Sequence, residues 1–225
     1  MPTKHFFPLA VPVILFFFVL IGVLITAVEV GAIQYAYEKI GIDKRYVFTL
    51  LLLALLGSYV NIPVAELPAK RVLSNQEIPL LAMGHVIPAV EELRRTVIAV
   101  NLGGAVIPTL LSVYLLLKNG MVGPTAVAIL IVSAIVYWMA RPVAGVGIVV
   151  PTLVAPLMAT ATALLLAQSS APAVAYIAGT LGTLIGADLL NLGQIQGLGA
   201  PIVSIGGAGT FDGIFLTGII AVLLA

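Results

Sequence analysis

Two aspartates near the C-terminal end of the chain have the side chains needed for acid–base chemistry. Asp188 and Asp212 are separated by a glycine-rich run, GLGAPIVSIGGAG at 197–209, and no other charged residue lies between them. Two carboxyl groups about 3 Å apart cannot both ionise cheaply, so they share one proton. One can then act as general base on water while the other acts as general acid toward a carbonyl. We therefore take Asp188 and Asp212 as candidate catalytic residues, without assigning base or acid.

The composition indicates whether the chain that carries these aspartates folds in water or in a lipid bilayer. Hydrophobic residues make up 61% of the chain and charged residues 8%, whereas soluble domains average about 45–50% and about 25%. We therefore predict a single integral membrane domain over residues 1–225. The absence of cysteine excludes disulfides and thiolate chemistry, and two histidines are too few for a histidine-rich metal site. We expect no metal, no cofactor and, with a net charge of +1, no nucleic-acid partner.

Apolar segments predict the helices that position the two aspartates. A membrane-spanning helix needs roughly 20 mainly apolar residues. Seven segments meet or approach this length, at 7–28, 46–60, 96–117, 123–139, 151–167, 172–190 and 211–225. The first is longer than the core of a cleavable signal peptide, so we expect it to be retained. The predicted fold class is all-α, a polytopic transmembrane helical bundle of about seven helices, with short strand-like segments in loops on the same side.

Basic residues near the segment ends predict an orientation in the cell membrane. Six would lie on the side of the N-terminus and four on the other side, which favours a cytoplasmic N-terminus. The six are Lys4, Lys70, Arg71, Arg94, Arg95 and Arg141, and the four are Lys39, Lys44, Arg45 and Lys118. The long connection at 63–95 would then be a cytoplasmic loop. Within it, residues 80–96 are expected to form an amphipathic helix lying on the membrane.

The predicted helices place the two aspartates at a similar depth. A helix beginning near Pro172 reaches Asp188 close to its far end, and Thr210 is a plausible N-cap for the last helix, with Asp212 in the first turn. Because these helices run antiparallel, the two carboxylates could face each other. A simpler alternative stays open: Asp212 caps a helix dipole and Asp188 reaches the headgroups. Acidic residues within membrane segments are costly, however, and are usually functional.

The segment between the aspartates contains a predicted strand. Ile202, Val203, Ser204 and Ile205 form a mainly β-branched run between Pro201 and the glycines Gly206 and Gly207. A similar segment, GVGIVVP at 145–151, falls on the same side of the membrane. The two could pair with each other or accept an extended peptide by β-augmentation. We predict that residues 202–207 and Gly209 bind substrate; alternatively, both segments are apolar loops or re-entrant ends.

Other small and polar residues have structural as well as functional explanations. Gly179, Gly182 and Gly186 recur at helical spacing, which allows close helix packing. A further set of polar residues could line a water-filled path or simply form hydrogen bonds between helices and at the interface. That set is Glu29, Gln34, Asn61, Asn101 and Asn191.

The segments GADLLNLG at 186–193 and GGAGTFDGIFLTG at 206–218 carry a resemblance to known families. They resemble a family of uncharacterised archaeal and bacterial multi-spanning membrane proteins, a domain of unknown function, over most of the chain. More remotely, they are similar to the intramembrane aspartyl proteases: presenilin, signal peptide peptidase and preflagellin peptidase. Those enzymes have Tyr-Asp on one helix and Gly-x-Gly-Asp on the next. Here Asp188 follows Gly186-Ala187, and Asp212 follows Gly209-Thr210-Phe211.

Some of those proteases add Pro-Ala-Leu on a later helix, whereas here the order is Ala155-Pro156-Leu157, ahead of both aspartates. The resemblance implies a protease that hydrolyses membrane-embedded peptides. The alternative is an ion- or proton-coupled transporter or channel, with Asp188 and Asp212 lining the pathway, although the two halves share no repeat. A scaffold or assembly factor is a third possibility. Expected partners are membrane lipids and a transmembrane peptide; the oligomeric state does not follow from the sequence.

Overall fold

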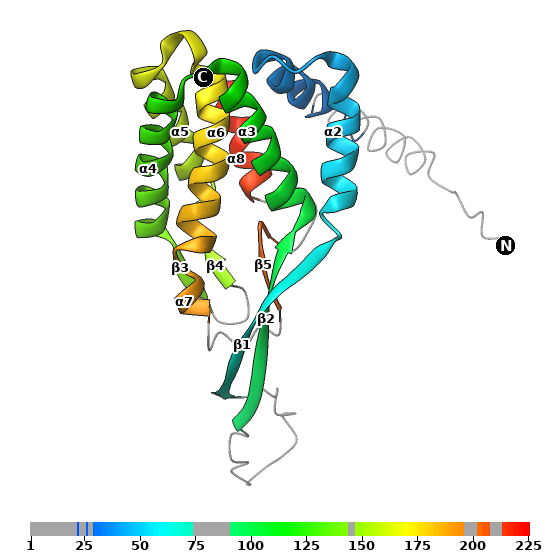
Figure 1. Ribbon diagram of the computed structural model, residues 1–225, viewed down its shortest axis with the longest axis vertical. Coiled ribbons are helices and arrows are strands. Elements are labelled where there is room, and N and C mark those ends of the chain that lie inside the picture. Colours follow the sequence, from blue (N-terminus) through cyan, green and yellow to red (C-terminus); the bar gives the residue numbers. More distant parts are fainter. Residues whose placement is uncertain are drawn as a thin grey trace, which may run out of the picture.

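The computed structural model describes residues 22, 26, 29–73, 91–143, 147–195, 202–207 and 213–225. Most of these residues are helical, and helices lie side by side at one end of the molecule while all the strands gather at the other (Figure 1). After a helical stretch at 29–39, the principal helices are α2 (Lys44–Gly57), α3 (Ile107–Asn119), α4 (Val122–Met139), α5 (Val154–Leu166), α6 (Ala171–Thr183) and α8 (Gly213–Leu224).

Among the residues that the structure describes, three helical segments are long and apolar enough to cross a membrane. They are Leu102–Asn119, Val122–Met139 and Gln168–Gln194, and two shorter apolar helices, Val154–Leu166 and Gly213–Leu224, accompany them. The molecule therefore has the helices of a membrane protein, as the composition predicted. The predicted first span at 7–28 lies outside the described residues, except for positions 22 and 26.

Helix α6 occupies the middle of the bundle and packs against α3, α4, α5 and α8. Its glycines make these approaches close, as the sequence predicted. A Cβ built on Gly182 would lie 2.7 Å from Cγ1 of Val132 on α4, and one on Gly179 would meet a methyl carbon of Thr217 on α8 at 3.2 Å. Gly182 therefore allows α6 to pack closely against α4, and Gly179 allows it to pack closely against α8.

The third predicted span begins later than its hydropathy suggested. Residues 96–101 are the end of a strand, and the helix starts with a π-helical turn, η1 (Leu102–Val106), which continues into α3. Hydropathy measures how favourable it is to move apolar side chains out of water. This free energy is equally favourable whether the segment forms a helix or a strand. The start predicted at Thr96 is therefore wrong by six residues.

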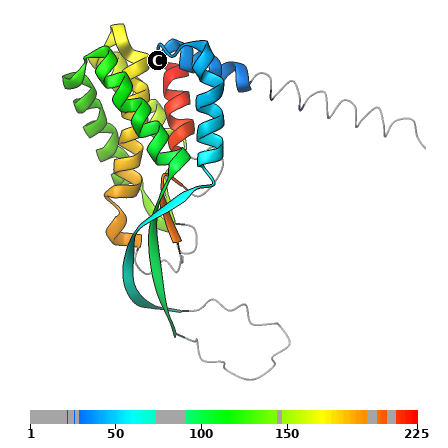
Figure 2. The ribbon, with the colours of Figure 1, turned by 45° about the vertical axis from the view of Figure 1, so that its right-hand side comes forward.

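The described parts of the predicted loop at 63–95, residues 63–73 and 91–95, form a long β-ribbon. Strand β1 (Asn61–Leu73) pairs antiparallel with β2 (Glu91–Asn101), and the ribbon extends away from the helices (Figures 1 and 2). The prediction of an amphipathic helix at 80–96 is wrong for residues 91–96, and its first part, 80–90, lies outside the described residues. A helical period is a property of one segment alone, whereas the ladder partners of residues 91–96 lie 18 to 29 residues earlier in the chain, from Leu73 opposite Glu91 to Leu67 opposite Thr96.

The predicted strand at 202–205 is confirmed as β5 (Ile202–Ile205), which runs parallel to β2 in a sheet of order β1-β2-β5. The similar segment at 145–151 contains β4 (Gly147–Val149), which pairs antiparallel with β3 (Arg141–Val143). The two predicted segments are therefore strands at the same end of the molecule (Figure 1), but they do not pair with each other.

The two predicted groups of basic residues lie at opposite ends of the bundle. Lys118 donates to the carbonyl of Gly41 just before α2, and Lys39 donates to the carbonyl of Val222 in the last turn of α8. Lys44 and Arg45 begin α2 at this same end. The other group lies on β1, β2 and β3 at the strand end (Figure 1), apart from Lys4, which is outside the described residues. Hereafter, these are called the helical end and the strand end.

Candidate functional site

Asp188 lies at the strand end, where α6 continues as a π-helical segment, η3 (Leu184–Leu189). The residue is half-buried, and its Oδ2 accepts a hydrogen bond from the backbone N–H of Gly206 at 2.8 Å. π-Helical turns are rare and occur frequently at functional sites. The contact joins the apolar helical segment Gln168–Gln194 to the glycines that follow β5.

Asn191 stabilises the widened turn that carries Asp188. Its side chain is almost fully buried, and Nδ2 donates to the carbonyls of Gly186 at 2.8 Å and Ala187 at 3.1 Å. Its Oδ1 accepts from Nε2 of Gln194, in the short helix α7 (Leu192–Ile195). Both functional groups of the amide are therefore engaged, which supports the hydrogen-bonding alternative for Asn191 over a water-filled path.

Gly104 and Gly206 bring the start of α3 against the turn after β5. A Cβ on Gly104 would lie 1.9 Å from the carbonyl oxygen of Gly206, and a Cβ on Gly206 would lie 2.6 Å from the backbone nitrogen of Ala105. Gly206 also has a φ of +85°, which favours glycine. Backbone therefore contacts backbone here, and the position of the Gly206 N–H relative to Asp188 depends on that contact.

A chain of hydrogen bonds connects the strands to the same place. Asn101, which ends β2 and is 1% exposed, donates from Nδ2 to the carbonyl of Ser58 at 2.7 Å and to Oδ1 of Asn61 at 3.1 Å, and its Oδ1 accepts from the N–H of Gly104 at 2.7 Å. Ser204 on β5 donates from Oγ to Oδ1 of Asn61. Asn61 and Asn101 thus hold α2, β1, β2, η1 and β5 together.

Sequence reasoning missed Ser58 and the pair Gly103-Gly104 as parts of this site. A Cβ on Gly103 would lie 2.0 Å from the carbonyl oxygen of Ala54 on α2, while Gly104 faces Gly206. The adjacent glycines directly after Asn101 were the available signal, because a glycine pair at the start of a span indicates close backbone approach.

Asp212 and Gly209 lie outside the described residues, but the chain is described again from Gly213, where α8 begins. Ile214 is 3% exposed and belongs to one hydrophobic cluster with Leu184 on η3 and Ile205 on β5. Leu184, four positions before Asp188, and Ile214, two positions after Asp212, therefore belong to the same packed core. The structure brings Asp188, β5 and the start of α8 to one place at the strand end.

Strand β5 leaves one edge without a strand partner among the described residues, because its other edge pairs with Val97–Val100 of β2. Of the predicted substrate-binding residues, Ile202 is 60% exposed, whereas Ile205 and Gly206 are buried. The Ser204 hydroxyl and the Gly206 N–H already have partners. The first half of β5 is therefore the part best placed to contact another chain. The described residues contain no group of three histidine, aspartate or glutamate side chains that could hold a metal ion.

A family model for a protein of unknown function, DUF1614, matches residues 55–224. The chain belongs to the DUF1614 family. The matched region begins in α2 and ends in α8, so it includes the whole site around Asp188. The predicted resemblance to an uncharacterised family is confirmed, whereas no link to intramembrane proteases emerges. No curated protein and no solved structure matches the chain.

Proposed function

We propose that this DUF1614 protein is an intramembrane aspartyl-type protease in which Asp188 and Asp212 share a proton and activate water. The observation that carries the proposal is the hydrogen bond from the Gly206 N–H to the Asp188 carboxylate, at the end of a membrane-spanning helix. This bond holds Asp188 against the segment that leads to Asp212. Within the dyad, the ionised carboxylate takes a proton from water as the water oxygen attacks the peptide carbonyl carbon, and the protonated partner donates its proton to the carbonyl oxygen. The tetrahedral intermediate then collapses: the C–N bond breaks, the first aspartate passes its proton to the leaving nitrogen, and the second takes a proton back from a hydroxyl group of the intermediate.

The edge of β5 that has no strand partner among the described residues would supply a site for an extended substrate. A peptide that unwinds from a membrane helix exposes N–H and C=O groups, which cost several kcal/mol each in lipid when unpaired. Addition to the edge beside Ile202 and Val203 would satisfy these groups by β-augmentation. The peptide would then lie next to the turn at Gly206, which contacts Asp188.

In the same proposal, the chain is a multi-pass protein of the cell membrane, its helices form a polytopic bundle, and the strand end faces the cytoplasm with the N-terminus. The strand end carries five of the described basic residues and the helical end four, and this excess supports the arrangement because positive residues are retained on the cytoplasmic side. The protease site would then open toward the cytoplasm.

This orientation predicts opposite labelling at the two ends. The natural chain has no cysteine, so Lys44→Cys at the helical end and Arg141→Cys at the strand end each introduce one thiol. Both positions are exposed. A membrane-impermeant maleimide added to intact cells should label position 44 and should label position 141 only after permeabilisation. The reverse pattern would invert the proposed topology.

The protease proposal is tested by incubating purified protein with a panel of single-span peptides. We expect cleavage inside the apolar segment, and we expect a hydroxyl-bearing mimic of the tetrahedral intermediate to inhibit it, because such mimics bind more tightly than substrates. Cleavage that resists the mimic but stops with a metal chelator or a serine-directed reagent would assign the activity to other chemistry.

A transporter is the second candidate, and buried hydroxyl groups between helices favour it. Thr125 and Ser133 on α4 and Thr183 on α6 each carry a buried hydroxyl oxygen without a hydrogen-bond partner among the described residues, and such atoms suit a hydrated path through a bundle. Purified protein in liposomes would then move protons or a cation, and flux would stop in Asp212→Asn. Flux that survives substitution of both aspartates would contradict a carrier that uses Asp188 and Asp212.

A further inference from the structure

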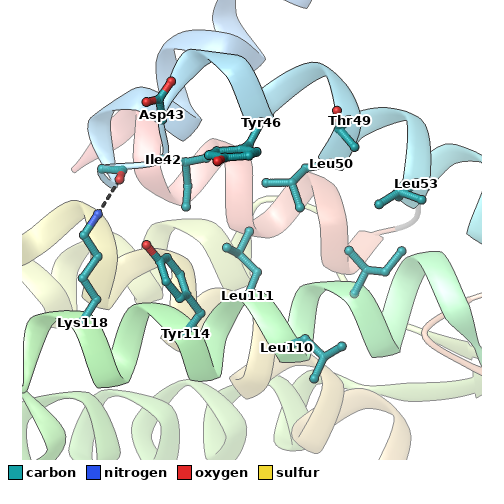
Figure 3. Close-up of a pocket in the computed structure, with 12 residues that line it drawn as sticks. Ile42, Asp43, Tyr46, Thr49, Leu50, Leu53, Leu110, Leu111, Tyr114 and Lys118 are labelled. Atoms are coloured by element: carbon teal, nitrogen blue, oxygen red, sulfur yellow. Dashed lines mark hydrogen bonds between the residues drawn. The ribbon is translucent and has the colours of Figure 1, made fainter.

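A groove between α2 and α3 runs from the helical end as far as Leu53 and Ile107, and none of its lining residues belongs to the aspartate site. It has a volume of about 660 Å³, within the range of roughly 300–1,000 Å³ typical of ligand sites. The walls are mainly leucine and isoleucine side chains that face each other across the gap, as Figure 3 shows for Leu50 and Leu53 above and Leu110 and Leu111 below. Leu53 and Leu110 are more than half exposed, so the groove opens to the side of the bundle.

The charged residues of the groove gather at one end. Asp43, Tyr114 and Lys118 lie together there, whereas Leu53 and Leu110 lie toward the other end (Figure 3). Lys118 Nζ donates to the carbonyl of Gly41 and lies 5.8 Å from the centre of the Tyr114 ring. Tyrosine and lysine are typical of the boundary between hydrocarbon and headgroups, so the groove begins at an interface and descends into the hydrocarbon.

The length of the groove matches one leaflet. Its lining on α3 extends from Ile107 to Lys118, a rise of roughly 16 Å at about 1.5 Å per residue. Half of a hydrocarbon core of about 30 Å is nearly the same length. An acyl chain that descends from a headgroup at Lys118 would therefore remain in the groove through its own leaflet.

The charges at the polar end favour an anionic headgroup. Asp43 is already neutralised, because its Oδ2 pairs with Nη2 of Arg45 at 2.9 Å. The hydrogen bonds from the Arg45 side chain and then from its backbone N–H lower the pKa of the Asp43 carboxyl. Lys44 pairs with Glu38 at 3.3 Å. Lys118 donates one hydrogen bond to the carbonyl oxygen of Gly41, and an ammonium group carries three donors, so donors remain for a phosphate.

We infer that the groove between α2 and α3 holds one acyl chain of an anionic phospholipid whose phosphate contacts Lys118. The bound lipid fills the gap between two helices that otherwise touch over only a short length. This site is independent of the proposed protease chemistry at the opposite end, because none of the residues that line the groove belongs to the aspartate site.

Lipid affinity measured by native mass spectrometry tests whether the charge of Lys118 sets the preference for an anionic headgroup. The delipidated protein in detergent is titrated with phosphatidylglycerol or with phosphatidylcholine of the same acyl chains. We expect wild type to bind phosphatidylglycerol about tenfold more tightly, because both lipids offer a phosphate but the positive choline of phosphatidylcholine is repelled by the Lys118 ammonium. Lys118→Gln should remove that preference, while Arg141→Gln, a matched loss of charge at the strand end, should keep it. Equal affinities in wild type, or an unchanged preference in Lys118→Gln, would overturn the inference.

Filling the groove tests the acyl-chain contact. Leu53→Trp and Leu110→Trp narrow it from opposite walls and should each weaken binding of both lipids. Leu117→Trp is the matched control, because Leu117 is an exposed leucine on α3 that does not line the groove. Circular dichroism checks that each variant is folded. If the control weakens binding as much as both groove variants, the lipid does not occupy the groove.

Photo-crosslinking identifies the occupant directly. Benzoylphenylalanine in place of Leu110 should form an adduct with phospholipid in vesicles that contain phosphatidylglycerol. An adduct with residues 1–28 of the same chain, or with a second copy, would assign the groove to a protein segment and would overturn the lipid assignment.

Discussion

Replacing either Asp188 or Asp212 by asparagine is expected to lower peptide cleavage almost as far as replacing both. The two carboxyl groups act as a unit in the proposed mechanism, and losses from such groups are far from additive; single and combined removals in other proteases each cost on the order of 10⁴–10⁶ in kcat. The measurement is kcat on a membrane-embedded peptide for wild type, both single variants and the double variant. Multiplicative losses in the double variant would show that the two aspartates act independently.

The same assay has an internal control and a pH signature. Asparagine is isosteric with aspartate, so Asp188→Asn can retain a contact with the Gly206 N–H through its amide oxygen, and the fold should persist. The wild-type rate should pass through a maximum with pH, because one carboxyl must be ionised and the other protonated. Asp43→Asn is the matched control for losing an aspartate, since Asp43 lies at the helical end. If it lowers cleavage as much as Asp188→Asn does, the loss is not specific to the dyad.

The largest expected effect on stability comes from Gly104→Ala. A Cβ there would lie 1.9 Å from the carbonyl oxygen of Gly206, and backbone cannot rotate aside as a side chain can. We expect a loss of roughly 3 kcal/mol in unfolding free energy, the upper end of the range for overpacking. Separating η1 from the turn after β5 would also move the Gly206 N–H away from Asp188. The measurements are denaturant unfolding in detergent and cleavage activity.

Gly123→Ala is the matched control for this substitution. Gly123 lies in the first turn of α4, and a Cβ there would meet no other atom within 4 Å. Alanine is preferred over glycine in helices by roughly 0.5–1 kcal/mol, so the control should be unchanged or slightly more stable. If Gly104→Ala unfolds at the same denaturant concentration as Gly123→Ala, the close approach of Gly104 to Gly206 does not stabilise the fold.

Much of the architecture follows from local sequence. Hydropathy predicted the helices at 123–139 and 172–190 closely, since the removal of apolar side chains from water depends on composition within one segment. The strand at 202–205 was predicted because its proline and glycine boundaries and β-branched residues are local features. The placement of Asp188 at the end of its helix needed only the helix rise and the position of Pro172.

What the sequence by itself determined, then, was the membrane setting, the apolar helices, one short strand and the carboxylates with acid–base potential. Only the tertiary structure decided that β1 and β2 form a ribbon, that β5 pairs with β2, and that Gly206 contacts Asp188 and Gly104. Each of these contacts joins residues far apart in the chain. Strand pairing and backbone approach depend on a partner, and hydropathy within one segment carries no information about which partner will be chosen.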